Sequence, residues 1–174
     1  MIDKFEKVPF EEFERAATIC GADAPYLAEL YENIKLPMRA TRGSAGYDFY
    51  TPFDIRIYAG ESVIIPTGIR AVIPENWTLL CVPRSGNGFK TGVRLMNTVG
   101  VIDSDYYNPG KCEGQIMIKL TNKDYGDRSI EYKRGDGIMQ GILVPYCTLD
   151  EYDEERWAAE ELKERTGGFG STGA

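Results

Sequence analysis

Residues 53–74, FDIRIYAGESVIIPTGIRAVIP, contain the pattern that decides the fold of this 174-residue chain. Apolar side chains alternate with polar or aromatic ones over residues 53–58, and Ala59-Gly60 then turns the chain. A period of two between turns is typical of half-buried β-strands. Runs of the same kind, bounded by Gly or Pro, are residues 62–66, 68–73, 77–82, 115–121 and 138–144. Many short strands with this punctuation predict a sandwich or a barrel.

Helical spacing is found on both sides of this β region. Before it, one apolar stripe runs from Phe10 to Cys20, and a second from Leu27 to Ile34. After it, an acidic segment over residues 150–164 is compatible with a helix, and the last ten residues include four glycines. So much glycine predicts an arm that is ordered only by something it binds. We therefore divide the chain into a helical N-terminal extension (1–35), a β core (36–148), and an acidic segment with a Gly-rich C-terminal arm (149–174).

Composition excludes several classes of protein. The formal net charge is -7 at pH 7, whereas nucleic-acid polymers need a basic face, so no nucleic-acid partner is expected. No apolar run approaches bilayer length, and residues 1–9 lack the apolar core of a signal peptide, which predicts no membrane partner and a cytoplasmic location. The four cysteines are far apart and the chain has no histidine, so reduced thiols are expected rather than a zinc site.

The absence of histidine also limits the choice of a general base. A carboxylate in a dry hairpin is the natural candidate near neutral pH, and the segment 97–106, NTVGVIDSDY, offers two. Asp103 directly follows the apolar pair Val101-Ile102, which favours partial desolvation. Strand alternation would place Asp105 on the same face, so position alone leaves both open.

Two further segments have the composition of phosphate-binding loops. Pro83-Arg84-Ser85-Gly86 follows an expected strand and offers a guanidinium fork, a hydroxyl and accessible backbone amides, although four such residues are more often an ordinary turn. The tail RTGGFGSTG, residues 165–173, has one aromatic residue among glycines, which a solvated linker does not require. Its phenylalanine could stack on a flat ring. No glycine directly precedes the lysine near Gly88, so a P-loop ATPase is excluded.

Taken in order, these segments resemble the five sequence motifs of the trimeric dUTP pyrophosphatase (dUTPase) family, from about residue 35 to residue 173. The first motif is matched by ATRGSAGYD, residues 40–48, and the fourth by the turn and strand that lead to Gln140. The resemblance implies a mainly β fold, a jelly-roll-like distorted β-barrel that forms homotrimers with active sites shared among subunits. It also implies dUTP as substrate and Mg²⁺ as cofactor, in the cytosol of a bacterium or of a phage-infected host.

The resemblance assigns roles to individual residues. Asp48 would lie near the water shell of the metal, and Asp103 would be the catalytic base. Tyr106 would pack under the deoxyribose and exclude a 2'-hydroxyl. Asn97 and the backbone from Gly100 to Asp103 would read uracil. Phosphate contacts would come from Arg84, Ser85, Gly86, Gln140, Arg165, Ser171 and Thr172. The remaining substrate-binding residues would be Val101, Ile102, Met117, and Phe169 with Gly170 in the arm that closes over uracil. Catalysis would rest on Asp103, Gln140 and Arg165.

Three departures separate this chain from the common family pattern. The nine residues 106–114, from Tyr106 to Gly114, stand where the family usually has Tyr-Arg-Gly, which makes a six-residue insertion also found in some phage-type members. Gly137 stands where an arginine is usual, which predicts a missing ion pair. The tail from Arg165 to Phe169 is one residue shorter than the commonest form, and the helical N-terminus has no counterpart in the minimal family.

The resulting hypothesis is hydrolysis of dUTP to dUMP and pyrophosphate, which would keep uracil out of DNA and supply dUMP. A dCTP deaminase on the same fold is the second hypothesis, but Lys119 stands where that family has its catalytic glutamate. The third is a regulatory binding protein, with a protein partner, that uses nucleotide occupancy as a switch. Its extra surface would be the insertion and the N-terminal helices.

Overall fold

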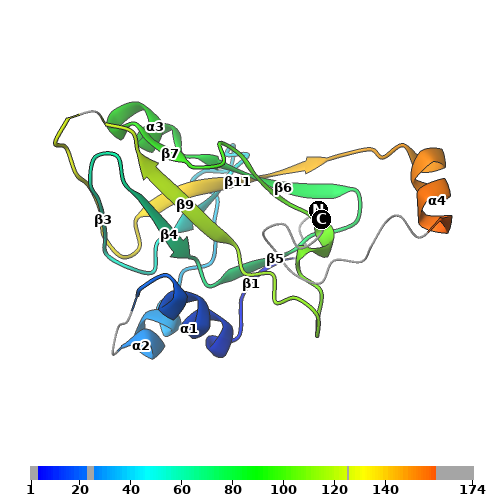
Figure 1. Cartoon of the computed structure of the whole chain (residues 1–174), viewed down its shortest axis with the longest axis horizontal. Coiled ribbons are helices and arrows are strands. Elements are labelled where there is room, and N and C mark those ends of the chain that lie inside the picture. The colour runs from blue at the N-terminus through cyan, green and yellow to red at the C-terminus, as the bar shows by residue number, and fades with distance from the viewer. Residues whose placement is uncertain (1–3, 23–25, 125, 160–174) are drawn as a thin grey trace.

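The structure is a computed structural model that describes residues 4–22, 26–124 and 126–159, apart from the side chains of residues 150–153. Within these ranges the chain is mainly β, as predicted (Figure 1). The strands are β1 Lys4–Lys7, β2 Tyr47–Tyr50, β3 Ile55–Ile57, β4 Ser62–Pro66, β5 Ile69–Val72, β6 Trp77–Pro83, β7 Val93–Leu95, β8 Gly100–Ile102, β9 Met117–Asn122, β10 Ile130–Tyr132 and β11 Gly137–Pro145. The helices are α1 Phe10–Ile19, α2 Leu27–Glu32, α3 Ser85–Thr91 and α4 Asp150–Ala158, with a short 3₁₀ helix at Ser104–Tyr106.

Antiparallel pairing joins strands that are distant in the sequence. The central sheet has the order β2-β11-β6-β8, and a second sheet has the order β4-β9-β7. Two further ladders pair β1 with β5 and β10 with β3. This exchange of partners is jelly-roll-like, as expected. In the part of the chain described, the strands form these four ladders and no continuous closed barrel.

The main core lies between the sheets, where alternate residues of each strand turn inward. In β9, for example, Ile118 and Leu120 are buried while Lys119 between them is exposed. Phe49, Leu79 and Ile138 reach the same core from the central sheet. Burial of each such side chain is worth about 1.5–3 kcal/mol, which fixes the register of the strands and therefore the positions of the loops that they carry.

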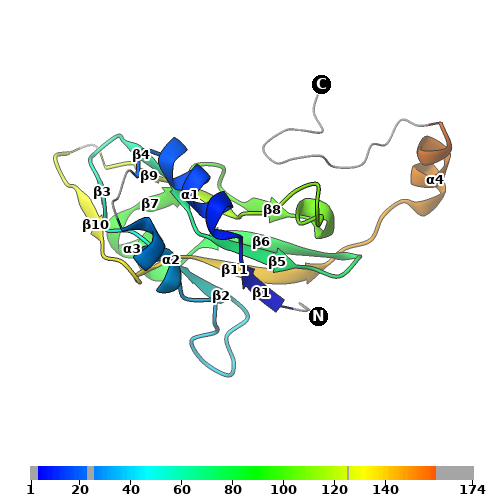
Figure 2. The same cartoon turned by 90° about the horizontal axis from the view of Figure 1, so that it is seen from below.

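The N-terminal extension is partly helical and partly β. α1 and α2 confirm the two expected helices, and Phe13 of α1 stacks on Phe53 with ring centroids 5.8 Å apart. Residues 4–7, expected to be helical, instead form β1, which pairs antiparallel with β5. Four residues are too few to show a helical period, and the unpaired edge of β5 supplies the hydrogen bonds. Both views place α1 and α2 against the β region (Figure 2).

Two other helices differ in how well the sequence predicted them. Arg84-Ser85-Gly86, expected as a turn, leads into α3, which ends at Gly92 in the left-handed conformation (φ 72°). α4 confirms a helix in the acidic segment, at the end of an extended connection that carries it away from the sheets (Figures 1 and 2). None of the helices in the described ranges is long and apolar enough to cross a membrane.

Candidate active site

A cavity of about 480 Å³ lies beside β8 and β9. It brings together six residues that the sequence predicted for the substrate site: Asn97, Gly100, Val101, Ile102, Tyr106 and Met117. Cys81 and Met139 of the central sheet close its apolar end, and Lys119 of β9 lies on its wall. A mostly apolar cavity with a few polar groups at its rim is suited to a planar base.

A tight turn before β8 shapes the rim of this cavity. Thr98 has a positive φ of 66°, and its amide donates to the Leu95 carbonyl over 3.0 Å. Gly100 pairs with Cys81, and a Cβ at Gly100 would lie 3.2 Å from the Cys81 Cβ and 3.7 Å from the Asn97 amide nitrogen. A glycine is therefore needed for β8 to approach β6 so closely. Burial raises the pKa of the Cys81 thiol to about 12, so this cysteine is protonated at neutral pH and is no nucleophile.

Asp103 lies directly after β8, where the chain leaves the sheet. It precedes the 3₁₀ helix Ser104–Tyr106, and the Tyr106 amide donates to its carbonyl over 3.2 Å. The expectation that strand alternation places Asp105 on the same face is wrong, because a 3₁₀ helix has three residues per turn. Asp103 is half-buried while Asp105 is exposed.

Val101 is 58% exposed, so the desolvation of Asp103 that was expected from Val101-Ile102 is smaller than the sequence suggested.

Tyr106 is fixed at its hydroxyl end. The hydroxyl donates to the backbone carbonyl of Gln115 over 3.0 Å, and the half-buried ring lines the cavity beside Met117. The ring gives the cavity a flat apolar wall on this side.

A second group of predicted residues surrounds Arg84. The Arg84 Nε lies 3.0 Å from the Asp48 carboxylate, and its Nη1 donates to the Gly137 carbonyl over 3.2 Å. Gln140 pairs with Asp48 across β11 and β2, and its side-chain amide donates to the Pro83 carbonyl over 3.3 Å. This Arg84 cluster, Asp48 with Arg84, Gly137 and Gln140, has the donors that an anionic ligand requires.

Gly137 explains how Arg84 reaches Asp48. A Cβ at Gly137 would lie 2.6 Å from the guanidinium carbon of Arg84, so Arg84 occupies the space that a side chain at 137 would need. The sequence predicted a missing ion pair at this departure, but Asp48 is paired with Arg84 instead. Asn87 also donates to the Gly137 carbonyl, over 3.1 Å. No local sequence pattern pointed to Asn87, because its contact with Gly137 depends on the helix α3, where a turn was expected.

The remaining predicted residues are either exposed or outside the described ranges. Ser85 and Gly86 lie exposed at the start of α3, next to Arg84. Outside the described residues are Arg165, Phe169, Gly170, Ser171 and Thr172. Among the described residues no three carboxylate or thiol side chains come together as a metal-binding group.

The 480 Å³ cavity and the Arg84 cluster lie on opposite faces of the central sheet. Met139 of β11 lines the cavity, while the next residue, Gln140, belongs to the Arg84 cluster. Successive residues of a strand point to opposite faces. Within the described residues, the cavity beside β8 and the Arg84 cluster are therefore separated by the central sheet.

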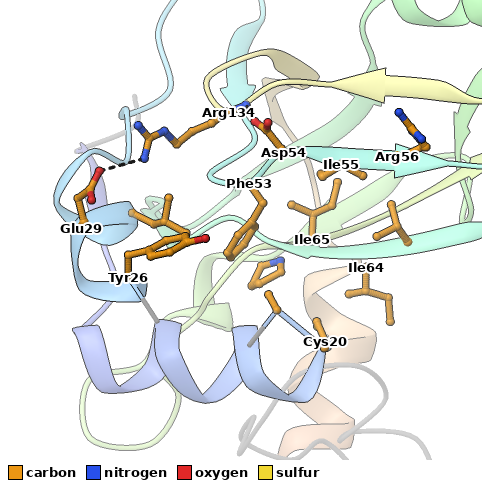
Figure 3. Close-up of a pocket in the computed structure, with 15 residues that line it drawn as sticks. Cys20, Tyr26, Glu29, Phe53, Asp54, Ile55, Arg56, Ile64, Ile65 and Arg134 are labelled. Atoms are coloured by element: carbon orange, nitrogen blue, oxygen red, sulfur yellow. Dashed lines mark hydrogen bonds and ion pairs between the residues drawn. The ribbon is translucent and has the colours of Figure 1, made fainter. Parts of the chain in front are cut away.

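A larger cavity, of about 800 Å³, lies between α2 and strands β3 and β4 (Figure 3). Its charged groups are already paired: Glu29 lies 3.5 Å from Arg134, and Asp54 accepts the Arg134 amide over 2.8 Å. Tyr26 is 58% exposed at its mouth. None of the predicted site residues lines it, so this cavity is not the candidate active site.

The fold and the two groups of residues define a protein of the jelly-roll type with a mostly apolar cavity on one face of its central sheet and an arginine–aspartate cluster on the other. The sequence profile of the dUTPase family matches residues 32–173. Because this match covers most of the sequence, the chain belongs to the dUTPase family.

Individual relatives agree with this assignment. The deoxyuridine 5'-triphosphate nucleotidohydrolase of Lactococcus lactis subsp. lactis is 40% identical over 146 residues, which cover 83% of this chain and 93% of the relative. The enzyme of the same name from Brucella melitensis is 34% identical over 164 residues, covering 90% and 98%.

Solved structures show the same fold. The dUTPase from Streptococcus mutans superposes with a TM-score of 0.60 at 38% identity, covering 68% of this chain and 91% of that one. A dUTPase from phage phi11 of S. aureus, described as having a species-specific insert, gives a TM-score of 0.57 at 23% identity and covers 67% of this chain and 86% of that one. At that identity the likeness concerns the fold alone.

Proposed function

We propose that this protein hydrolyses dUTP to dUMP and pyrophosphate. The observation that carries the proposal is the 480 Å³ cavity, which is lined by Asn97, β8 and Tyr106, while Asp103 lies in the chain between β8 and Tyr106 without being part of the lining. The relatives named deoxyuridine 5'-triphosphate nucleotidohydrolase support it. A cytoplasmic location fits this activity.

In the proposed mechanism, Asn97 and the backbone of β8 bind the uracil edge, and Tyr106 lies against the deoxyribose. A carboxylate oxygen of Asp103 takes a proton from a water molecule, whose oxygen attacks the α-phosphorus. The bond from that phosphorus to the bridging oxygen breaks, and pyrophosphate leaves. A general base contributes about 10²–10⁴-fold, and the remaining acceleration comes from positioning and from cationic groups on the phosphates.

Phosphate binding is proposed for Arg84, Ser85, Gly86 and Gln140, joined by residues of the C-terminal arm. In the arm, Phe169 with Gly170 would cover the base, and the phosphate contacts would come from Arg165, Ser171 and Thr172. Arg84 has donors beyond those used by Asp48 and Gly137, because a guanidinium carries five N–H groups.

The residues present fit a Mg²⁺ ion that is held mainly by the substrate. Asp48 is a single carboxylate beside Arg84, with 13% of its side chain exposed. Mg²⁺ usually keeps several waters and is bound through substrate phosphates with one or two carboxylates. Asp48 would hold a water of the ion. When bound, the ion neutralises charge on the triphosphate.

The placement of the two groups on opposite faces of one sheet supports a homotrimer with shared active sites. A complete site then takes Asp103 and Tyr106 from one subunit and the Arg84 cluster from another. Rotation about a closed symmetry axis repeats this contact three times.

The decisive test measures pyrophosphate release from dUTP, dTTP, dCTP and UTP. We expect a strong preference for dUTP. Release of ammonia from dCTP would instead identify a deaminase, although Lys119 on the cavity wall argues against this.

Asp103→Asn tests the assignment of the base. Turnover should fall by about 10²–10⁴-fold, while binding of a non-hydrolysable dUTP analogue stays within a few-fold, because the amide keeps the shape and loses the basicity. Asp105→Asn is the matched control in the same turn, and it should keep normal turnover. Equal losses in the two variants would mean that the base is misassigned.

A regulatory protein partner is a second proposed role, compatible with the first. It is supported by the exposed loop around Pro109-Gly110 and by α4, which extends away from the sheets. Pull-down with and without nucleotide tests it, and a nucleotide-dependent change in the captured partner is the expected result.

A further inference from the structure

The insertion at residues 107–114 forms a small closed loop next to Tyr106. Asn108 and Cys112 form an isolated bridge, with the Asn108 amide donating to the Cys112 carbonyl over 2.9 Å. Gly114 has φ +68°, and a Cβ there would lie 2.8 Å from the Tyr107 Cα. The loop therefore returns tightly onto the backbone that carries Tyr106.

Arg70 of β5 joins this loop to the N-terminal extension. Its Nη1 donates to the Glu113 carboxylate over 2.6 Å, and its guanidinium lies 4.1 Å from the ring centroid of Tyr107. Its Nε donates to Glu6 of β1 over 3.1 Å. The Arg70 side chain is only 16% exposed, so these contacts are better shielded than an ordinary surface ion pair.

Gln115 makes a second connection, between α1 and Tyr106 itself. Its side chain accepts the Gly68 amide over 3.1 Å and donates to the Glu12 carbonyl of α1 over 3.2 Å. Its backbone carbonyl accepts the Tyr106 hydroxyl. Gln115 is 4% exposed, so the same residue is anchored by the extension on one side and holds the tyrosine on the other.

Tyr106 needs such support because its ring does not rest on the main core. Besides the 480 Å³ cavity, Tyr106 lines a groove of about 630 Å³ between α1 and the insertion loop. Because Tyr106 borders both spaces, its position depends on the contacts at its hydroxyl end and in the adjoining loop.

We propose that β1 and α1 of the N-terminal extension, together with the insertion loop (residues 107–114), hold Tyr106 at the sugar end of the cavity. Arg70 and Gln115 are the positioning residues that connect them. The inference rests on the proposed function, in which Tyr106 lies against the deoxyribose. The N-terminal extension and the insertion loop, which both depart from the common family pattern, then share one role, the selection of a deoxyribose over a ribose.

The test compares kcat and KM for dUTP and UTP in four variants. Arg70→Met removes the charge shared by both partners, Glu113→Gln weakens the loop side, and Glu6→Gln weakens the extension side. Glu131→Gln is the matched control, since Glu131 also pairs with an arginine, Arg56, but between β3 and β10. Thermal melting confirms that each variant is folded.

Arg70→Met should raise the KM for dUTP and lower the dUTP-to-UTP ratio of kcat/KM by about tenfold, with kcat for dUTP within about twofold, because pocket shape discriminates by such factors. Glu113→Gln and Glu6→Gln should each lower the ratio by a smaller amount. The control should leave it unchanged. A general structural defect would lower kcat for both nucleotides alike.

A folded Arg70→Met variant with unchanged selectivity would overturn the inference. If Arg70→Met does not fold, the Glu6→Gln/Glu113→Gln double variant decides in the same way. A ratio that responds to Glu113→Gln but not to Glu6→Gln would also overturn it, because the extension would then have no part. Failure of the proposed function is distinct: the unaltered protein would then not hydrolyse dUTP at all.

Discussion

At the scale of the residue, Gly137 acts through the space that its missing side chain leaves for Arg84. Arg84 lies in the space above this glycine, between the Asp48 carboxylate and the Gly137 carbonyl. The guanidinium thus has a fixed orientation before any ligand is bound. Pre-orientation of a cationic group avoids a reorganisation cost when phosphate arrives.

Gly137→Ala should displace the Arg84 guanidinium, because a Cβ would lie 2.6 Å from its central carbon. We expect kcat/KM for dUTP to fall by about tenfold, the effect of one lost charge-assisted contact. The free energy of unfolding should change by less than about 1 kcal/mol, because only a flexible side chain has to move. The measurement is steady-state kinetics beside thermal melting.

Gly88→Ala is the control for this variant, since a Cβ at Gly88, one helical turn from Arg84, meets nothing within 4 Å. In a protein that already carries Arg84→Ala, Gly137→Ala should not lower kcat/KM further, because both substitutions act on the Arg84 guanidinium. Additive losses in the double variant would contradict the argument.

The residue scale also marks the limit of what a single sequence predicts. Five residues of the segment 97–106 line one cavity because they are close together in the chain, and their proposed roles in binding the substrate stay predictions from the family resemblance. The segment could not separate Asp103 from Asp105, since the choice depends on a 3₁₀ turn that has no periodic signal over three residues. Asn87 and Gln115 act through partners more than 40 positions away in the sequence, which no local pattern contains.

At the scale of the element, the runs bounded by Gly or Pro were predicted well, including the three-residue β3, whereas β7 and β10 were not predicted. β4 and β6 fall where their alternation placed them, whereas β7 and β10 have only three residues each. Such strands are stable only because neighbouring strands pair with them, and tertiary pairing is invisible in a local window. β1 is the same case, since its partner β5 lies more than 60 residues away.

β1 gives a pH-dependent contribution to stability through Glu6. The hydrogen bond from Lys4, and then that from Arg70, lowers the pKa of Glu6 from its ordinary value of 4.5, and burial opposes this in part. The folded state therefore favours the carboxylate, so the stabilisation is complete above pH 4.5 and is lost as the pH falls below it.

Glu6→Gln should accordingly lower the melting temperature by about 1–3 °C at pH 7, as expected for a partly exposed ion pair in a chain of this size. The difference between the variant and the unaltered protein should shrink as the pH falls below 4.5, because the carboxyl group becomes protonated first in the unfolded state and then in the folded state. Thermal melts across this range provide the measurement. A difference that stays constant with pH would show that Glu6 contributes through packing.

At the scale of the whole molecule, the central sheet separates the two halves of the proposed site. The cavity beside β8 opens on one face, and the Arg84 cluster lies on the other. The sequence predicted both groups but not their separation, because the faces of a sheet are set by pairings such as β11 with β6. A shared site in a trimer is the arrangement that reconciles them.

Mixed trimers test this arrangement. Asp103→Asn and Arg84→Ala subunits, each inactive alone, are unfolded together and refolded in equal amounts. If each site takes Asp103 and Arg84 from different subunits, random assembly should restore roughly a quarter of the sites, since each intact group is present half the time. Pyrophosphate release is measured against the two variants refolded separately. No recovery in the mixture would mean that one chain supplies both groups.

The ladder of β1 on β5 has a practical consequence for shortened forms of the protein. The family match begins at residue 32, so a truncated form starting there would be a natural choice for a minimal enzyme. Such a form would lack β1, and the backbone N–H and C=O groups of β5 that pair with β1 would be open to strands of other molecules. Edge strands of this kind pair between chains, so the trimmed protein should precipitate where the longer one stays dispersed.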